Sequence, residues 1–183
     1  MSELNPITPL NGASFAGYAN IRALGPLGMI TLRAKTDVTG LAAAIMAVTG
    51  CAVPATRQIL RAGDRLAGWM SPDEYLLILP YDQVQTALDA IASALAGQHH
   101  LAVDVSGARA VFAIEGAAPS VLAKLTPTDF TALGPMELRR TRLAQVAAAF
   151  WLEGGNATVV CFASVAQYMF DLLSHAAAAG TEI

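Results

Sequence analysis

Adjacent carboxylates at Asp73 and Glu74 are the first candidates for chemistry in this sequence. They stand with Ser71 and Pro72 between two apolar runs. Two close carboxylates can share acid and base roles, because each raises the pKa of the other. Neighbouring residues at a hairpin tip are solvated and gain little from this effect. Pro, Ser and Asp all favour tight turns, so we interpret the segment as a turn whose carboxylates are candidates for a partner contact.

The densest cationic group consists of Arg139, Arg140 and Arg142. One interpretation is the solvated face of a strand, with the arginine stems covering apolar area. The other is a contact with a partner protein or an anion, since arginine is enriched at interfaces and binds anions well. The sequence leaves both interpretations open, and the three arginines remain interface candidates.

Other familiar chemistry finds no support in the sequence. There is no Gly-x-Ser-x-Gly nucleophile motif, no P-loop and no Gly-x-Gly-x-x-Gly dinucleotide motif. His99 and His100 fall in an expected loop without a third ligand at useful spacing. Cys51 and Cys161 lie far apart in apolar surroundings, which is typical of buried thiols. We therefore expect no catalytic residue, metal or cofactor in this chain.

The composition indicates a protein that docks. The net charge of −3 argues against nucleic acid, and charged residues make up 14% of the chain, against roughly 25% in ordinary soluble domains. With 55% apolar residues, part of the surface is expected to be buried against partner chains. The uncharged segment 38–56 is interrupted by Gly50 and Pro54, so we expect no membrane span. The N-terminus lacks a signal pattern, so we expect a cytoplasmic protein.

The hydrophobic pattern predicts alternating strands and helices. Residues 1–24 show no sustained period and are expected to form an extended arm. In the first half we expect strands near 27–34, 56–61 and 65–70 and helices at 37–49 and from residue 82. In the second half we expect a strand pair near 101–115, a short helix in "APSVLAKL", an irregular "LTPTDFTALGP", one or two strands in 139–152, a strand in "ATVVCF" and a helix from residue 164. Asp82 with Gln85, and Ser164 with Gln167, match helix capping pairs.

A constant offset relates the two halves. Trp151 follows Trp69 by 82 residues, and Ser164 follows Asp82 by the same number. This offset indicates a duplication. We expect one domain over residues 1–183, made of the arm and two pseudo-repeats, 25–98 and 101–180. The predicted fold class is α+β, with pseudo-duplicated antiparallel sheets and helices that resemble paired ferredoxin-like units.

An ordered set of segments, spanning about residues 20 to 178, resembles the gamma subunit of heterotetrameric sarcosine oxidase. These segments are "GWMSPDEYLLILP", "VDVSGARAVFAIEG", "KLTPTDF", "RTRLAQVAAAFWL" and "FASVAQYMFDLL". The resemblance implies a fold similar to the aminomethyl-folate domain of the glycine-cleavage T-protein. It also implies assembly with alpha, beta and delta subunits in an enzyme that oxidatively demethylates sarcosine to glycine. In that enzyme oxygen is the acceptor, and the one-carbon unit passes to tetrahydrofolate.

The same resemblance assigns the cofactors to other chains. FAD, FMN, NAD, zinc and tetrahydrofolate are implied for the partner subunits, and none for this one. Asp129, in "LTPTDFTAL", matches a functional aspartate of the T-protein pattern and is a candidate for a vestigial folate site. The Gly-rich segment that follows it in T-proteins is missing here, and an aspartate after Thr-Pro-Thr also favours a turn. The alternative function is a free-standing, T-protein-like folate-binding protein.

Overall fold

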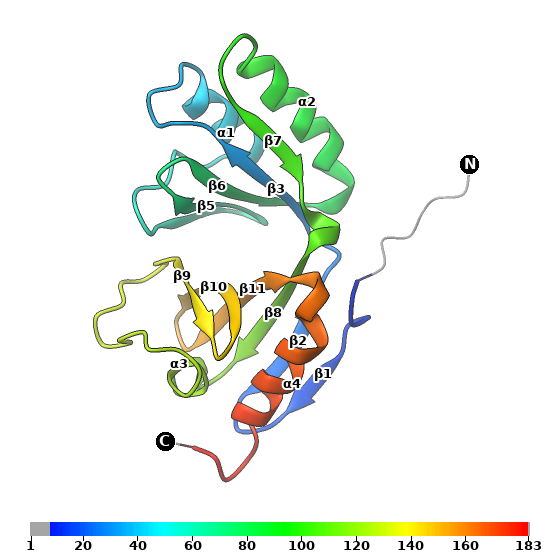
Figure 1. Cartoon of the computed structure of the whole chain (residues 1–183), viewed down its shortest axis with the longest axis vertical. Helices are drawn as coiled ribbons and strands as arrows, with labels where there is room; N and C mark the ends of the chain where they lie inside the picture. Colours follow the sequence, from blue (N-terminus) through cyan, green and yellow to red (C-terminus); the bar gives the residue numbers. More distant parts are fainter. Residues whose placement is uncertain (1–7, 183) are drawn as a thin grey trace, which may run out of the picture. The chain divides into compact units, whose positions relative to one another are not determined.

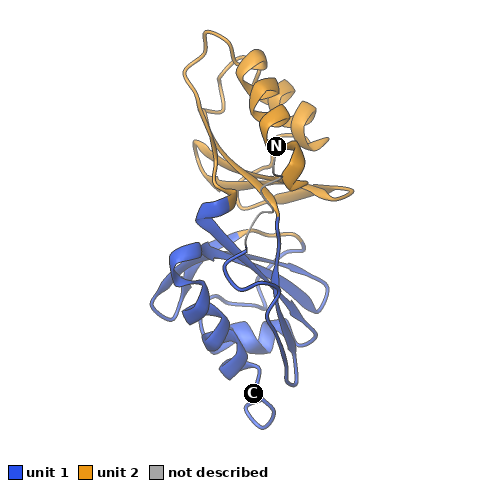
Figure 2. Cartoon of the chain, turned by 90° about the vertical axis from the view of Figure 1, so that its right-hand side faces the viewer, with its two compact units in different colours: residues 1–26, 107–135, 139–183 blue, residues 27–106, 136–138 orange. Residues whose placement is uncertain are grey.

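The computed structural model describes residues 8–182, which form two compact units (Figure 2). Unit 1 comprises residues up to 26, residues 107–135 and residues from 139 onward, and unit 2 comprises residues 27–106 and 136–138. Each unit contains one antiparallel sheet and two α-helices. The predicted α+β class with two antiparallel sheets is therefore confirmed. The assignment of residues 1–183 to one domain with two pseudo-repeats stays a prediction.

Unit 2 is a five-stranded sheet with helices packed against one face (Figure 1). Its order is β4-β5-β6-β3-β7. The elements are β3 (Gly28–Arg33), α1 (Leu41–Thr49), β4 (Ile59–Ala62), β5 (Arg65–Ser71), β6 (Glu74–Leu79), the 3-10 turn η1 (Tyr81–Gln83), α2 (Val84–Ala94) and β7 (Leu101–Asp104). Ile30 and Leu77 from the sheet and Ile45 and Ile91 from the helices are fully buried in its core.

Helix α1 shows how local sequence sets an element's limits. The predicted stripe of Leu41, Ile45 and Val48 is buried. The helix begins at Leu41 and not at residue 37, because Gly40 precedes it in a left-handed conformation with φ of 89°. It ends where predicted, at Gly50, whose φ of 68° is also left-handed and suits a residue without a Cβ atom.

Unit 1 is a six-stranded sheet in the order β1-β2-β8-β11-β10-β9. The elements are β1 (Ser14–Ala16), β2 (Asn20–Leu24), β8 (Arg109–Glu115), α3 (Ala118–Ala123), β9 (Arg139–Leu143), β10 (Val146–Glu153), β11 (Asn156–Phe162), the 3-10 turn η3 (Ala163–Val165) and α4 (Ala166–Ala176), with η2 (Ser106–Ala108) before β8. Phe112, Phe150 and Val159 from the sheet meet Met169 and Leu173 of α4 in a buried core.

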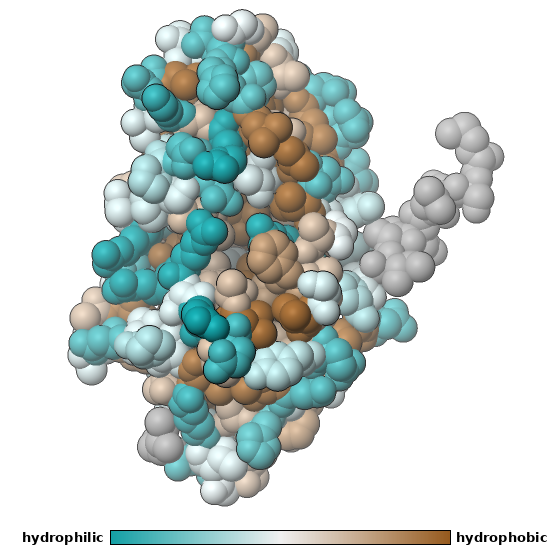
Figure 3. Space-filling model, viewed as in Figure 1, coloured by the Kyte–Doolittle hydropathy of each residue, from teal (hydrophilic) through white to brown (hydrophobic). Residues whose placement is uncertain are grey.

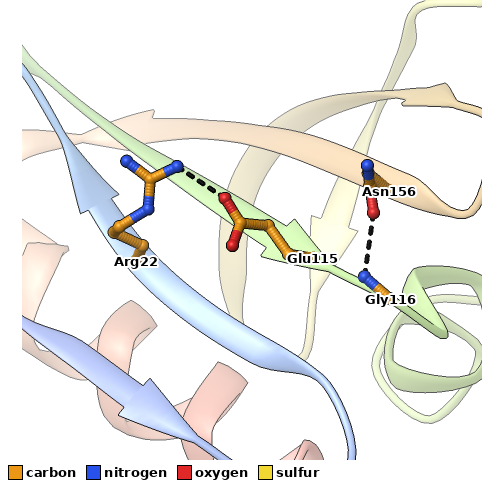
Figure 4. A network of polar contacts seen from close by, with 4 residues as sticks. All are labelled: Arg22, Glu115, Gly116 and Asn156. Atoms are coloured by element: carbon orange, nitrogen blue, oxygen red, sulfur yellow. Dashed lines mark hydrogen bonds and ion pairs between the residues drawn. The ribbon is translucent and has the colours of Figure 1, made fainter.

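Residues 14–24, assigned to an extended arm from the sequence, form strands β1 and β2 of this sheet. Of the rest of that arm, residues 8–13 are described and contain a turn at 9–12, and residues 1–7 lie outside the described residues. Strand β2 pairs along its length with β8, and Arg22 Nη2 donates to Glu115 Oε1 at 2.5 Å (Figure 4). Next to it, the Gly116 amide donates to Asn156 Oδ1 at 2.8 Å, which joins the end of β8 to β11 (Figure 4). The segment is therefore held in the sheet by both backbone and side-chain bonds.

The two sheets share one plan, with one strand exchanged. Strand β2 lies beside β8 as β7 lies beside β3, although β2 comes before β8 in the chain and β7 comes after β3. The two strands predicted near 101–115 form as β7 and β8, but they do not pair with each other. β7 pairs with β3 in one sheet, and β8 pairs with β2 and β11 in the other.

Helices α2 and α4 keep the offset of 82 residues from end to end. The predicted capping pairs do not form at either helix, whose N-caps, Gln83 and Val165, make no side-chain capping bond. A 3-10 turn leads into each helix instead. Gln85 Nε2 donates to Asp89 Oδ1 at 3.0 Å in the first half, and the same bond, at 2.9 Å, links Gln167 to Asp171 in the second.

Candidate interaction site

The turn between β5 and β6 is bonded to strand β3. Arg33 Nη2 donates to Asp73 Oδ2 at 2.7 Å, Ser71 Oγ donates to Asp73 Oδ1 at 3.1 Å, and the Ala34 amide donates to the Asp73 carbonyl at 3.0 Å. The hydrogen bond from Arg33, followed by that from Ser71, lowers the pKa of Asp73. Glu74 lies opposite Arg33 in the β3–β6 register. Asp73 is thus an ionised carboxylate with a cationic partner, and the predicted turn is confirmed.

A hollow of about 410 Å³ adjoins this turn in unit 2. Its lining is Arg33, Ala34, Lys35, Asp73, His99, His100 and Leu101. The imidazole Nδ1 of His100 lies 3.0 Å from the Gln98 carbonyl oxygen. Arg33 is committed to Asp73, whereas the structure records no side-chain hydrogen bond or ion pair for Lys35 or His99 among residues 8–182. The lining of the hollow therefore contains two basic side chains and two imidazoles but one carboxylate.

The three clustered arginines lie on β9, at the edge of the unit 1 sheet. Arg140 and Arg142 are exposed and Arg139 is half-buried, as alternation along a strand requires. Arg142 Nη2 donates to the side chain and the carbonyl of Gln145, at 3.1 and 3.3 Å. Arg142 and Gln145 also line a shallow hollow of about 380 Å³ with Leu125, Pro127, Thr141 and Ala144. Charged side chains on an edge strand discourage unwanted strand pairing, so their placement suits the solvated-face interpretation. Their role at an interface stays a prediction.

Asp129 lies in the irregular segment that leads to β9. Its Oδ1 accepts hydrogen bonds from the Thr131 amide at 2.9 Å and the Thr131 hydroxyl at 2.7 Å. The pKa of Asp129 is lowered, mainly by the hydrogen bond from the Thr131 hydroxyl and then by that from the Thr131 amide. The side chain is exposed and lines neither of the two hollows described above. This local turn accounts for the aspartate without a ligand, and a folate role for it stays a prediction.

Cysteines and histidines form no ligand group in the described part of the chain. No three His, Cys, Asp or Glu side chains among residues 8–182 are placed to hold a metal ion. Cys51 and Cys161 are free and buried, and burial raises the pKa of Cys161 to about 11. In the same residues, no helix has the length and hydropathy needed to cross a bilayer.

Sequence reasoning placed Asp73 in its turn but missed the cationic hollow beside it. Arg33 and Lys35 are two residues apart at the end of β3, a spacing that puts them on one side of an extended chain. That spacing was the available signal. The missing information was the sheet order, because β3 lies between β6 and β7 and so brings the 71–74 turn and the loop with His99 and His100 to the same strand end.

The fold, two ferredoxin-like units related by an internal offset, defines a duplicated α+β protein. A family model described as "Sarcosine oxidase, gamma subunit family" matches residues 33–138, more than half of the chain. The chain therefore belongs to the sarcosine oxidase gamma subunit family. The comparison with curated protein sequences finds no match.

Solved structures agree with this assignment. A chain of the heterotetrameric sarcosine oxidase from Corynebacterium sp. U-96, in complex with pyrrole 2-carboxylate, is 26% identical with a TM-score of 0.83, over 93% of this chain and 94% of that one. Aminomethyltransferase T of the glycine cleavage system from Bartonella henselae shares the fold, with 12% identity and a TM-score of 0.64 over 86% of this chain and 45% of that one. The regulatory subunit of aspartate kinase from Thermus thermophilus is more distant, with 17% identity and a TM-score of 0.50 over 90% and 99% of the two chains.

Proposed function

We propose that this chain is the non-catalytic gamma subunit of a heterotetrameric sarcosine oxidase, assembled with alpha, beta and delta subunits in the cytoplasm. The complex would convert sarcosine, tetrahydrofolate and oxygen to glycine, 5,10-methylenetetrahydrofolate and hydrogen peroxide. The observation that carries the proposal is the match to a heterotetrameric sarcosine oxidase over almost the full length of both chains, together with the family match.

The contribution of this chain to the complex is structural in the proposal. The two candidate carboxylates accept hydrogen bonds within the chain, Asp73 from Arg33 and Asp129 from Thr131. FAD, FMN, NAD, zinc and tetrahydrofolate belong to the partner subunits in this proposal. A low charged fraction of 14% supports a chain that covers part of its surface with a partner.

Co-expression tests the proposal. The chain is produced with tagged alpha, beta and delta subunits, and the purified complex is sized by light scattering and native mass spectrometry. We expect one gamma chain per complex. Elution of this chain alone, while the other three subunits assemble, would contradict the proposal.

The alternative, a free-standing folate-binding protein, is not favoured but has a direct test. Binding of isotopically labelled tetrahydrofolate to the isolated chain is compared between wild type and Asp129→Ala. Saturable binding that the substitution abolishes would support a folate site at Asp129. Its absence in both proteins would leave Asp129 with its turn-forming role alone.

A further inference from the structure

Strand β7 carries apolar side chains that unit 2 leaves uncovered. Leu101 is 53% exposed and Val103 is 40% exposed. They lie on one face of the strand and pair in register with Arg33 and Thr31 of β3. Figure 3 shows apolar side chains gathered over the place where Figure 1 draws β7. Edge strands are usually protected by charge, as on β9, so an apolar edge points to a partner.

The backbone of β7 also has bonding groups to offer. The Val105 amide donates to the Met29 carbonyl at 2.8 Å, which fixes the alternation of hydrogen-bonded pairs along β3 and β7. In the observed register, the N–H and C=O groups of Leu101 and Val103 face β3. Those of Ala102 and Asp104 point the other way. Since β7 is the last strand of its sheet, an added strand could bond to these groups.

The cationic hollow lies at the Leu101 end of the same strand. Leu101 lines it together with Arg33, Lys35, His99 and His100. Lys35 and His99 are exposed, and the structure records no side-chain bond for either among the described residues. A carboxylate is the group that would complement this lining, because Arg33 and Asp73 pair with each other and Lys35 adds a further cationic side chain.

We propose that β7 and the adjoining hollow dock an extended segment of another subunit as an added antiparallel or parallel strand. Alternate apolar side chains of that segment pack on Leu101 and Val103, and one of its carboxylates enters the hollow beside Lys35 and His99. Strand addition of this kind takes its affinity from backbone bonds and its specificity from side-chain pockets. The inference rests on the proposed function, because it takes the segment from a subunit of the same complex.

The test uses variants in the co-expressed complex. Leu101→Asp places a charge on the apolar face. Ala102→Pro removes an outward N–H for which residues 8–182 offer no recorded partner, and Lys35→Glu reverses a charge of the hollow. We expect each variant to lower the amount of gamma chain that co-purifies with the other subunits. The loss should be about tenfold or more for Leu101→Asp, since buried apolar anchors dominate interface energies. Hydrogen exchange should also show the Ala102 and Asp104 amides protected in the complex relative to the free chain.

Matched variants separate docking from folding. Met46 is 50% exposed on α1 of the same unit, so Met46→Asp introduces the same charge at similar exposure away from β7. Ala102→Ser keeps the amide that Ala102→Pro removes. Both controls should assemble like wild type, and thermal melts of the isolated variants verify that each is folded.

The outcomes are distinguishable. If wild type and all β7 variants co-purify equally and the two amides exchange at free-chain rates, the docking inference is overturned and the proposed function stands. If wild type itself does not co-purify, both fall. If the isolated chain forms a dimer that Ala102→Pro returns to monomer, β7 binds a second copy, and the proposed occupant is wrong.

Discussion

Lys124 fastens the end of helix α4 to the rest of unit 1, and its removal should destabilise that unit. Its Nζ donates to the Ala176 carbonyl at 2.8 Å, to the Thr181 hydroxyl at 2.9 Å and to the Thr181 carbonyl. It also lies 4.9 Å from the centroid of the Tyr18 ring. Carbonyls in the last turn of a helix have no partner within the helix, and a cation there is favourable.

The substitution Lys124→Met isolates this effect because methionine keeps the apolar stem and removes the ammonium group. A hydrogen bond to a charged group contributes about 1.5–3 kcal/mol, and a cation at a helix C-terminus about 0.3–1 kcal/mol. The site is half-buried, so we take the lower part of the first range and expect a loss of about 2 kcal/mol. With a urea dependence of about 1–3 kcal/mol per molar, the midpoint should fall by roughly 1 M.

The chain supplies its own control, since Lys35 is its other lysine. Lys35 is exposed, and the structure records no side-chain bond for it among the described residues, so Lys35→Met should change the free energy of unfolding by less than about 0.5 kcal/mol. Urea unfolding of the isolated chain, followed by circular dichroism, measures both. Hydrogen exchange at the C-terminal end of α4 should also accelerate in Lys124→Met alone. Equal midpoints for the two variants would refute the reasoning.

Three further predictions concern acid stability, thiol reactivity and a close contact. The pKa of Asp73 is lowered in the folded chain. Its ion pair with Arg33 therefore stabilises the fold at pH values above the unfolded pKa of about 3.9, and this stabilisation is lost as the pH falls through the folded pKa. The urea midpoints of wild type and Asp73→Asn should differ at neutral pH and converge in acid. Cys161, with its pKa raised to about 11 by burial, should react with a disulfide reagent at pH 8 only after unfolding, and fast reaction of the native chain would contradict this. Gly28→Ala would place a Cβ 2.6 Å from Val84 Cγ2 and should cost about 1–3 kcal/mol, whereas Gly107→Ala, with nothing within 4 Å, should leave the thermal midpoint unchanged.

The sequence predicts elements well where local chemistry decides them. The stripe of α1, its stop at Gly50 and the turn at 71–74 all follow from periodicity and turn residues. The helix starts show the limit of this reasoning. Asp82 and Gln85 have the right spacing for a capping box, but the 3-10 turn η1 occupies that place and Gln85 bonds to Asp89 along the helix. A spacing of three residues does not distinguish these two arrangements.

Pairing between distant strands could not be predicted, because it depends on which sheet each strand joins. β7 and β8 are close in sequence and belong to different sheets. β2 joins a sheet whose other main strands begin at residue 109. The segment looked like an arm because residues 1–24 show no sustained period. Its partner strand was too far along the chain for any local pattern to indicate.

The candidate interaction surface follows the same division. Composition predicts that part of the apolar surface is buried against a partner, and this prediction does not depend on how the strands are arranged. Its location depends on which strands end each sheet. At the edge of unit 1 lies β9, with Arg139, Arg140 and Arg142, and at one edge of unit 2 lies β7, with Leu101 and Val103. Arginines at an edge keep strands apart, while apolar side chains beside free backbone groups invite one. The arginine cluster is conspicuous in the sequence because its charges are dense. Strand β7 is the better candidate for a docking surface, because the fold places its apolar side chains at a sheet edge.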